Sequence, residues 1–238
     1  MTSFPMLSLH TGILIATCLV PAACRSREQP PAPPAGEVAR ETAAADVFMV
    51  LPGDYNESIS VADLEARFGA ANVKREGGEE PRVVLFPDDP TRRAYVSFYE
   101  QEKYEHLARI MVTDPDSRWR GKHGVHVGMS VAKLRELNGK PFYYSGFDQQ
   151  RRGSVHDGWS PALEDDEKQP LGNFDVSEGD RLYFDLELGV ADPSKVTSPG
   201  DLPVDEHLSS DDPRFPRFRE LVTVTAISAS SSLDDEWN

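Results

Sequence analysis

The sequence predicts an α+β fold made of two tandem repeats, in which short helices pack on an antiparallel sheet. Three observations lead to this prediction: a stretch of sequence that recurs, hydrophobic residues that alternate along several segments, and turn signals between those segments. The predicted repeats cover residues 47–120 and 121–228. An export signal (1–23) and a Pro/Ala-rich tether (24–46) precede them, and an acidic tail (229–238) follows.

The first segment of the chain is typical of an export signal. Residues 7–20 are almost all apolar or small, and a run of about fourteen such residues suits a signal peptide better than a membrane-spanning helix. The sequence Pro-Ala-Ala-Cys, which ends at Cys24, follows directly and resembles the bacterial lipobox. That resemblance implies cleavage before Cys24, which would then carry lipid such as palmitate and anchor the protein to a bacterial membrane.

Two features depart from the lipobox pattern, because Pro21 stands three places before the cysteine and no Lys or Arg precedes the hydrophobic run. The alternatives are cleavage by an ordinary signal peptidase followed by secretion, and a chain that keeps its leader. Residues 25–46 contain four prolines and no aromatic residue, so they cannot bury enough surface to fold. We therefore expect a tethered domain in the bacterial cell envelope, facing the periplasm.

The repeat aligns residues 59–69 with residues 129–139, and five of the eleven positions are identical. In each copy a serine, Ser60 or Ser130, stands where a helix N-cap accepts a backbone hydrogen bond. A glycine ends each copy, where a left-handed conformation costs little. The apolar positions at helical spacing are Val61, Leu64 and Phe68 in the first copy and Val131, Leu134 and Leu137 in the second. We favour tandem duplication over chance similarity of two amphipathic helices.

Strand-like segments follow each predicted helix. Along residues 181–188, apolar and polar residues alternate, which is typical of an antiparallel strand with one buried face. Turns rich in Pro and Asp, at 87–90 and 114–117, separate the strands of the first repeat. The expected strands are 83–86, 94–99 and 108–112 in the first repeat and 142–145, 181–188 and 222–226 in the second, with long loops at 148–176 and 192–216.

The composition restricts the classes of partner. The chain has 40 Asp and Glu against 25 Lys and Arg, a formal net charge of −15. A surface of this charge repels nucleic acids, so we expect no nucleic-acid partner. The two cysteines, Cys18 and Cys24, both lie near the N-terminus. A disulfide framework or a cysteine-based zinc site is therefore not expected in the folded part.

The search for catalytic and cofactor motifs points to a protein without them. The patterns GxSxG, GxGxxG and GxxxxGK[ST] do not occur. His123 and His126 have no HExxH context and no evident third ligand. Asp114 and Asp116 begin like a calcium loop, which Arg118 interrupts. We expect no catalytic residue, no metal and no cofactor, and hence no enzyme.

A group of aromatic and arginine residues after the second predicted helix is the main candidate for a partner-binding surface. Tyr, Trp and Arg are enriched at the energetic centres of protein interfaces, because they bury much area with few rotatable bonds. The alternative is that these aromatic residues pack in the core, since a strand buries one of its faces. The candidate partner-binding residues are Tyr143, Tyr144, Phe147, Arg151, Arg152 and Trp159.

The second copy of the repeat also carries a family resemblance. Its residues Gly128, Met129, Ser130, Leu134, Leu137, Gly139 and Pro141 resemble the pattern of SmpA/OmlA (BamE-like) lipoproteins. The duplicated unit is similar to that of the β-lactamase-inhibitor-protein-like fold, and residues 138–148 look like those of a group of bacterial envelope lipoproteins. The resemblance implies small helices on an antiparallel sheet and a role in binding envelope proteins, without catalytic residues.

The sequence therefore predicts a non-catalytic, lipid-anchored envelope protein that acts as a protein-binding module. One alternative is a secreted inhibitor of an envelope or extracellular enzyme. Another is a hydrolase that uses an unfamiliar site.

Overall fold

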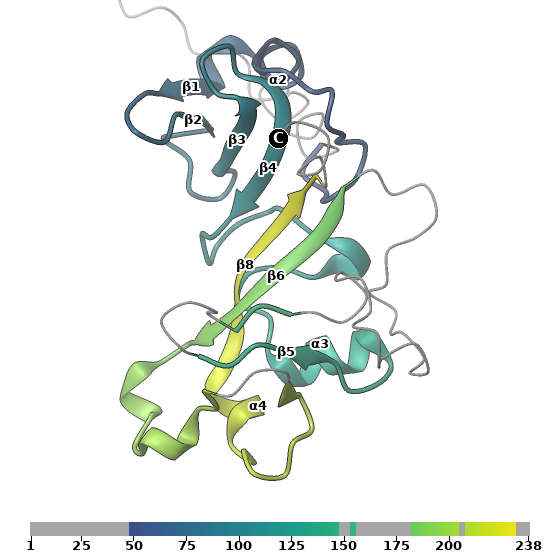
Figure 1. Cartoon of the computed structure of the whole chain (residues 1–238), viewed down its shortest axis with the longest axis vertical. Helices are drawn as coiled ribbons and strands as arrows, with labels where there is room; N and C mark the ends of the chain where they lie inside the picture. Colours follow the sequence, from purple (N-terminus) through teal and green to yellow (C-terminus); the bar gives the residue numbers. More distant parts are fainter. Residues whose placement is uncertain (1–47, 148–152, 156–181, 205–207, 232–238) are drawn as a thin grey trace, which may run out of the picture.

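The computed structural model describes residues 48–147, 153–155, 182–204 and 208–231. These residues form an α+β fold with a six-stranded antiparallel sheet, in the order β1-β2-β3-β4-β8-β6, and a separate two-stranded pair, β5-β7 (Figure 1). None of the helices in this part of the chain is long and apolar enough to cross a membrane. The predicted export signal, the tether and Cys24 lie outside the described residues.

The elements follow one another as short helices and longer strands. The α-helices are α2 (Val61–Phe68), α3 (Val131–Asn138) and α4 (Phe218–Leu221). The strands are β1 (Val73–Glu76), β2 (Arg82–Leu85), β3 (Ala94–Glu100), β4 (Glu105–Val112), β5 (Tyr143–Tyr144), β6 (Tyr183–Val190), β7 (Leu208–Ser209) and β8 (Val222–Ser230). Short 3-10 helices are η1 (Ala70–Asn72), η2 (Lys122–Gly124), η3 (Pro193–Lys195) and η4 (Pro199–Asp201).

Helix α2 begins at the predicted serine cap. The Ser60 hydroxyl accepts a hydrogen bond from the Asp63 backbone N–H at 3.4 Å, and the Asp63 carboxylate accepts one from the Ser60 N–H at 2.9 Å. This reciprocal capping box satisfies two backbone donors that a helix start leaves without partners. The helix ends before Gly69, whose φ of 82° lies in the region that favours glycine.

Helix α3 repeats the same local plan. Ser130 accepts a hydrogen bond from the Lys133 N–H at 3.2 Å, and Gly139, with φ 79° and ψ −10°, ends the helix in the left-handed conformation. Position by position, residues 131–138 have the same sequence of buried, half-buried and exposed side chains as residues 61–68.

The buried face of α3 differs from the prediction at its last turn. Leu137 is half-buried at the edge of that face, and Asn138 is the residue that lies inside, 1 % exposed. The reason is helix geometry. With 3.6 residues per turn, side chains seven positions apart, such as those of Val131 and Asn138, point in nearly the same direction, whereas side chains six positions apart do not. The equivalent position in α2 is occupied by Phe68.

The observed strands overlap every predicted one, with shifted ends. Strand β1 was not predicted, because Lys74, Arg75 and Glu76 give it no apolar alternation. Strand β8 continues to Ser230, two residues into the range assigned to the acidic tail. The expected loop at 192–216 contains η3, η4 and the short strand β7. Most of the expected loop at 148–176 lies outside the described residues.

A single sheet crosses the predicted boundary between the two repeats. Strand β4 of the first predicted repeat pairs with β8 of the second predicted repeat, and Arg109 stands opposite Ser230 in the register. Gly121 lies at this junction, where an added Cβ would stand 2.0 Å from the Phe184 ring. The long pair β6 and β8 connects the two ends of the molecule (Figure 1).

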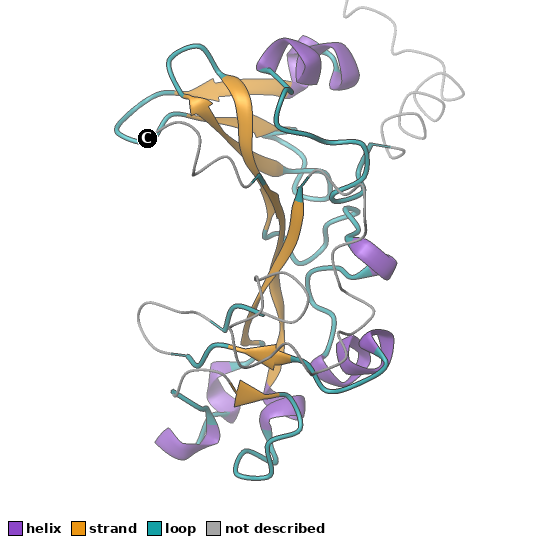
Figure 2. Cartoon of the chain, turned by 45° about the vertical axis from the view of Figure 1, so that its right-hand side comes forward, coloured by secondary structure: helices purple, strands orange, loops and turns teal. Residues whose placement is uncertain are grey.

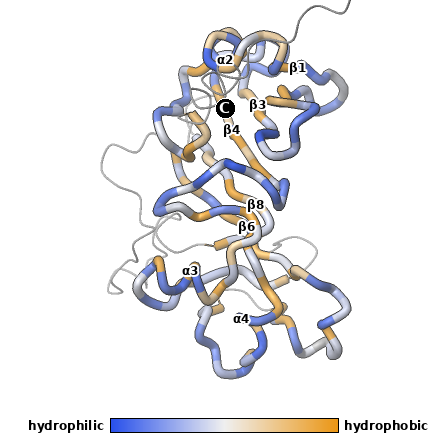
Figure 3. Tube along the Cα trace, turned by 180° about the vertical axis from the view of Figure 1, so that it is seen from behind, coloured by the Kyte–Doolittle hydropathy of each residue, from blue (hydrophilic) through white to orange (hydrophobic). Residues whose placement is uncertain are grey.

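The main core lies between the sheet and the helices. Helices α2 and α3 pack on the same side of the sheet (Figure 2). Trp119 is fully buried there, and its indole N–H donates to the Arg92 carbonyl at 2.8 Å. Figure 3 shows hydrophobic stretches along β3, β4 and β8, the strands at the centre of the sheet.

Candidate functional site

The opposite face of the sheet is the surface with the most distinctive chemistry. Between β1 and the Tyr183 end of β6, none of the described helices packs on this face (Figure 2). The strand register places one set of alternate side chains together there. We call this set the open sheet face: Lys74, Glu76, Arg82, Val84, Tyr95, Ser97, Tyr99, Arg109, Met111, Tyr183, Asp185, Glu187, Ser228 and Ser230.

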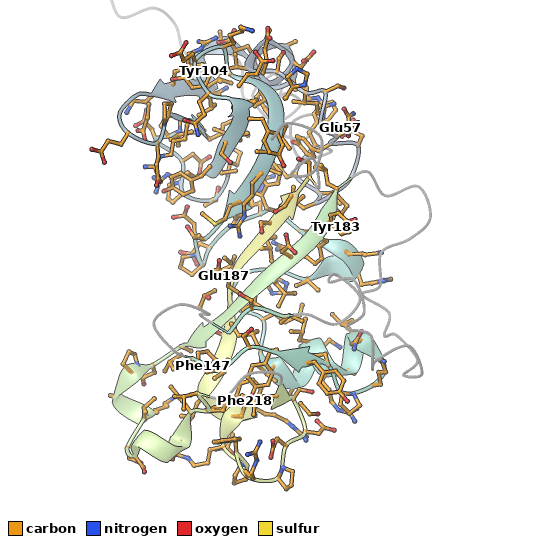
Figure 4. The ribbon with its side chains drawn as sticks, viewed as in Figure 1. Glu57, Tyr104, Phe147, Tyr183, Glu187 and Phe218 are labelled. Atoms are coloured by element: carbon orange, nitrogen blue, oxygen red, sulfur yellow. The ribbon has the colours of Figure 1, made fainter. Side chains whose placement is uncertain are left out.

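Three tyrosines stand on the open sheet face. Tyr95 and Tyr99 are half-buried on β3, and Tyr183 on β6 is 37 % exposed (Figure 4). The Arg82 guanidinium lies 4.9 Å from the centre of the Tyr95 ring, within range of a cation–π contact. Because the strands fix their backbones, binding a partner has only the side chains left to order.

Arg109 lies between these tyrosines, on β4. Its Nη2 donates to the Ser228 hydroxyl at 2.9 Å and lies 3.5 Å from the Glu187 carboxylate. Its Nε is buried and has no hydrogen-bond partner among the residues that the structure describes. A buried donor without an acceptor costs about 1–3 kcal/mol. This guanidinium can therefore gain from an additional acceptor.

Asp185 is the second charged group at the centre of the face. Burial raises its pKa above the ordinary aspartate value, because desolvation disfavours the charged form. A hydrogen bond with Ser230 and the charge of Arg109 act in the opposite direction, and the charge of Glu187 raises the pKa further. The face thus combines aromatic rings with a partly desolvated group of charges.

The local sequence pattern predicts part of the open sheet face. The alternation along 181–188 correctly separates buried Phe184 and Leu186 from polar Asp185 and Glu187. Tyr95, Tyr99 and Arg109 were not identified as site candidates. The alternation along 94–99 is consistent with the two tyrosines lying on one face of their strand. Pairing between β3, β4, β8 and β6 was needed to bring them together with Arg109 and Tyr183.

The aromatic residues predicted to bind a partner differ in how deeply the structure buries them. Tyr144 has no exposed surface and stacks on Phe218, with ring centres 4.4 Å apart and planes 5° apart. Phe147 is half-buried, and its ring centre lies 6.2 Å from that of Phe218 (Figure 4). Tyr143 is half-buried on β5.

Tyr144 therefore belongs to the core, as the alternative interpretation of this cluster anticipated. Burial raises the pKa of its hydroxyl above the ordinary tyrosine value. Arg151, Arg152 and Trp159 lie outside the described residues, so the structure does not bring the six candidates together into one surface.

The residues that suggested metal binding have other contacts. His126 Nδ1 lies 3.1 Å from the Gly124 carbonyl oxygen, and Asp114 pairs with Arg93 at 3.4 Å. No group of three or more His, Cys, Asp or Glu is placed to hold a metal ion within the described part of the chain. The predicted absence of a metal, cofactor or catalytic residue stays a prediction for the whole chain.

No protein-family model, no curated protein and no solved structure matches the chain. The resemblance to BamE-like lipoproteins rests on the sequence motif alone.

Proposed function

We propose that this protein is a non-catalytic binding module that recognises another envelope protein through the open sheet face. One observation carries the proposal: Tyr95, Tyr99 and Tyr183 lie around Arg109 on a face that no described helix covers. Tyrosine and arginine contribute most where they combine aromatic area with directed hydrogen bonds. The face offers both on a rigid support.

We also propose that Cys24 carries lipid and that residues 25–46 hold the domain away from the membrane. At about 3 Å per residue, such a proline-rich segment spans several tens of ångströms. Palmitate labelling that is lost in Cys24→Ala would support this anchor. Labelling absent from both the parent and the variant would contradict it, and would favour the secreted inhibitor as the alternative function of the same face.

Tandem duplication is the proposed origin of the two helical segments. Both helices begin at a capping serine and have the same pattern of burial, which supports this origin. Both helix starts also make the same kind of contact with a strand. The Ile59 carbonyl accepts from the Leu107 N–H of β4 at 3.1 Å, and the Met129 carbonyl accepts from the Val224 N–H of β8 at 2.9 Å. Residues 59 and 129 are equivalent positions of the repeat. Each helix start is thus attached to a strand in the same way.

Site-specific photo-crosslinking in cells tests the binding face. A photoreactive residue replaces Tyr183 on the open sheet face, and in a control chain it replaces Ala132, which is exposed on α3. We expect a crosslink to one discrete envelope protein from position 183 and none from position 132. With that partner purified, Tyr183→Ala should weaken binding at least about tenfold, as expected for an interface residue of this type.

Two outcomes of this experiment would contradict the proposal. Crosslinking from position 132 alone would place the interface on the helical side. Unchanged partner affinity in folded Tyr183→Ala and Tyr95→Ala variants would remove the open sheet face from the interface.

A further inference from the structure

Strand β1 forms one edge of the six-stranded sheet (Figure 1). It pairs with β2 on one side, and none of the described residues pairs with it on the other. The Phe86 N–H donates to the Asn72 carbonyl at 2.7 Å, and hydrogen-bonded positions alternate along an antiparallel pair. The backbone N–H and C=O of Arg75 therefore point away from β2, where a further strand can pair with them.

The side chains of this edge carry charges of both signs. Lys74 and Glu76 belong to the open sheet face, and the Lys74 Nζ lies 3.0 Å from the Glu76 carboxylate. The Lys74 side chain is 60 % exposed. Charged residues on a short edge strand keep most other strands away. An edge with a lysine and a glutamate two positions apart still matches a strand that presents the same charges in reverse order.

Strand β1 of a second copy, running antiparallel, presents that reverse order. If Arg75 stands opposite Arg75 of the second copy, Lys74 of each chain stands opposite Glu76 of the other. The outward N–H and C=O of the two Arg75 residues then bond to each other. The neighbouring registers that use outward backbone groups place Lys74 opposite Lys74, or Glu76 opposite Glu76. Backbone bonding and charge thus select a single register.

The two Arg75 side chains are the main unfavourable contact in this arrangement. Each is already neutralised within its own chain, because its guanidinium pairs with Glu65 of α2 at 2.7 Å. It also lies 5.9 Å from the centre of the Tyr104 ring, within range of a cation–π contact. The contact between the two edges is small, so we expect weak, reversible association rather than an obligate dimer.

We propose that two copies of this chain associate through their β1 edges, antiparallel and about a two-fold axis at Arg75. The two sheets then form one continuous sheet, and the two-fold axis keeps both open sheet faces on the same side. The expectation that a partner gains affinity by contacting both faces rests on the proposed function, whereas the association itself does not.

Photo-crosslinking between two copies tests the association. Two versions of the full chain with different tags are produced in the same cells, and a photoreactive residue replaces Arg75 in one of them. We expect a crosslinked product that contains both tags. In the control, the photoreactive residue replaces Ala132, which is exposed on α3, and should give no such product.

Charge-reversal variants show whether the contact uses the proposed register. Lys74→Glu and Glu76→Lys each place like charges opposite one another in a pair of identical chains. Each should lower the yield of the product at least about fivefold. A Lys74→Glu chain produced together with a Glu76→Lys chain is again complementary, so the yield should return to near that of the parent. Neither variant contains the ion pair within one chain, so this recovery reports contact between chains.

The inference is overturned if position 75 gives no product with both tags, or if position 132 gives as much. It is also overturned if the two variants, each verified as folded by circular dichroism, fail to recover the yield when combined. Failure of the proposed function has a different signature. In that case the two copies crosslink from position 75, but position 183 captures no envelope protein.

Discussion

Helices α2 and α3 share one backbone plan but are stabilised by different chemistry. Phe68, at the last buried position of α2, lies against aromatic rings, with its centre 5.3 Å from Phe86 and 6.3 Å from Trp119. The equivalent Asn138 of α3 donates a hydrogen bond to the Lys140 carbonyl at 3.3 Å. The comparison teaches that capping and burial pattern define the helix, while the residue inside can be aromatic or polar.

A second difference concerns the ion pairs that hold each helix to the rest of the fold. Glu65 of α2 pairs with Arg75 of β1 at 2.7 Å. Arg135, the equivalent residue of α3, donates hydrogen bonds to the Asp211 carboxylate through both Nε and Nη2. The same position thus forms an ion pair in both halves with the sign of the charge reversed. A local sequence comparison sees only a mismatch at this position.

Truncating the side chain at the last buried position should give the largest difference in stability between variants of the two helices. Phe68→Ala should lower the free energy of unfolding by about 3–5 kcal/mol, because it leaves a cavity among packed rings. Asn138→Ala should cost less, about 1–2 kcal/mol, because it removes a smaller and polar buried side chain. Urea unfolding followed by tryptophan fluorescence measures both. Equal losses would show that Asn138 contributes as much to its core as Phe68 does.

The junction between the halves should be the next most sensitive point. Gly121→Ala should cost about 1–3 kcal/mol, because the new methyl group overlaps the Phe184 ring. The φ of Gly121 is −89°, so the cost arises from packing rather than from backbone strain. Thermal unfolding measures it. Adding Phe184→Leu should reduce the penalty of Gly121→Ala, and purely additive losses would disprove the overlap.

The capping serines should give smaller, nearly matched effects. Ser60→Ala and Ser130→Ala should each cost about 1 kcal/mol in urea unfolding, because each leaves a helix N–H without its acceptor. The capping box of α2 adds a distinction. Asp63→Ala should reduce the cost of Ser60→Ala, whereas Lys133→Ala should not change that of Ser130→Ala. Coupling at both helices, or at neither, would contradict this difference.

The pH dependence should show the smallest effect, with opposite signs in the two halves. Hydrogen bonds from Ser60 hold the pKa of Asp63 below its usual value. Its stabilising contribution is present above the unfolded pKa and is lost as the pH falls through the lowered folded pKa. Asp63→Asn should therefore lose less stability than the parent between about pH 4 and about pH 2. Acid unfolding followed by circular dichroism measures this, and an unchanged acid transition would contradict it.

The contribution of Asp185 to stability should change with pH in the opposite direction. Burial raises its pKa, so its contribution is fully present below the unfolded pKa and is lost as the pH rises through the raised folded pKa. In Asp185→Asn the free energy of unfolding should fall less between acid and neutral pH than in the parent. Urea unfolding at several pH values checks this expectation. A larger fall in the variant would show that ion pairing with Arg109 outweighs burial.

The candidate site could be predicted only in part. The period-two pattern of β6 was sufficient to separate its polar face from its buried one, since each strand alternates by itself. Tyr144 illustrates the limit. Its place in an aromatic run did not reveal which face of β5 it takes, and the stack on Phe218, 74 positions along the chain, decided that it is buried.

The sequence by itself determined the short-range features: both serine caps, both glycine ends, the alternation of the strands and the turns between them. These features depend on residues within a few positions of one another, so local hydrogen bonding and periodicity specify them. Tertiary structure alone decided that β4 pairs with β8 and that Tyr99, Arg109 and Tyr183 share one surface. Those outcomes depend on the register between strands far apart in the chain, which packing of the whole core selects.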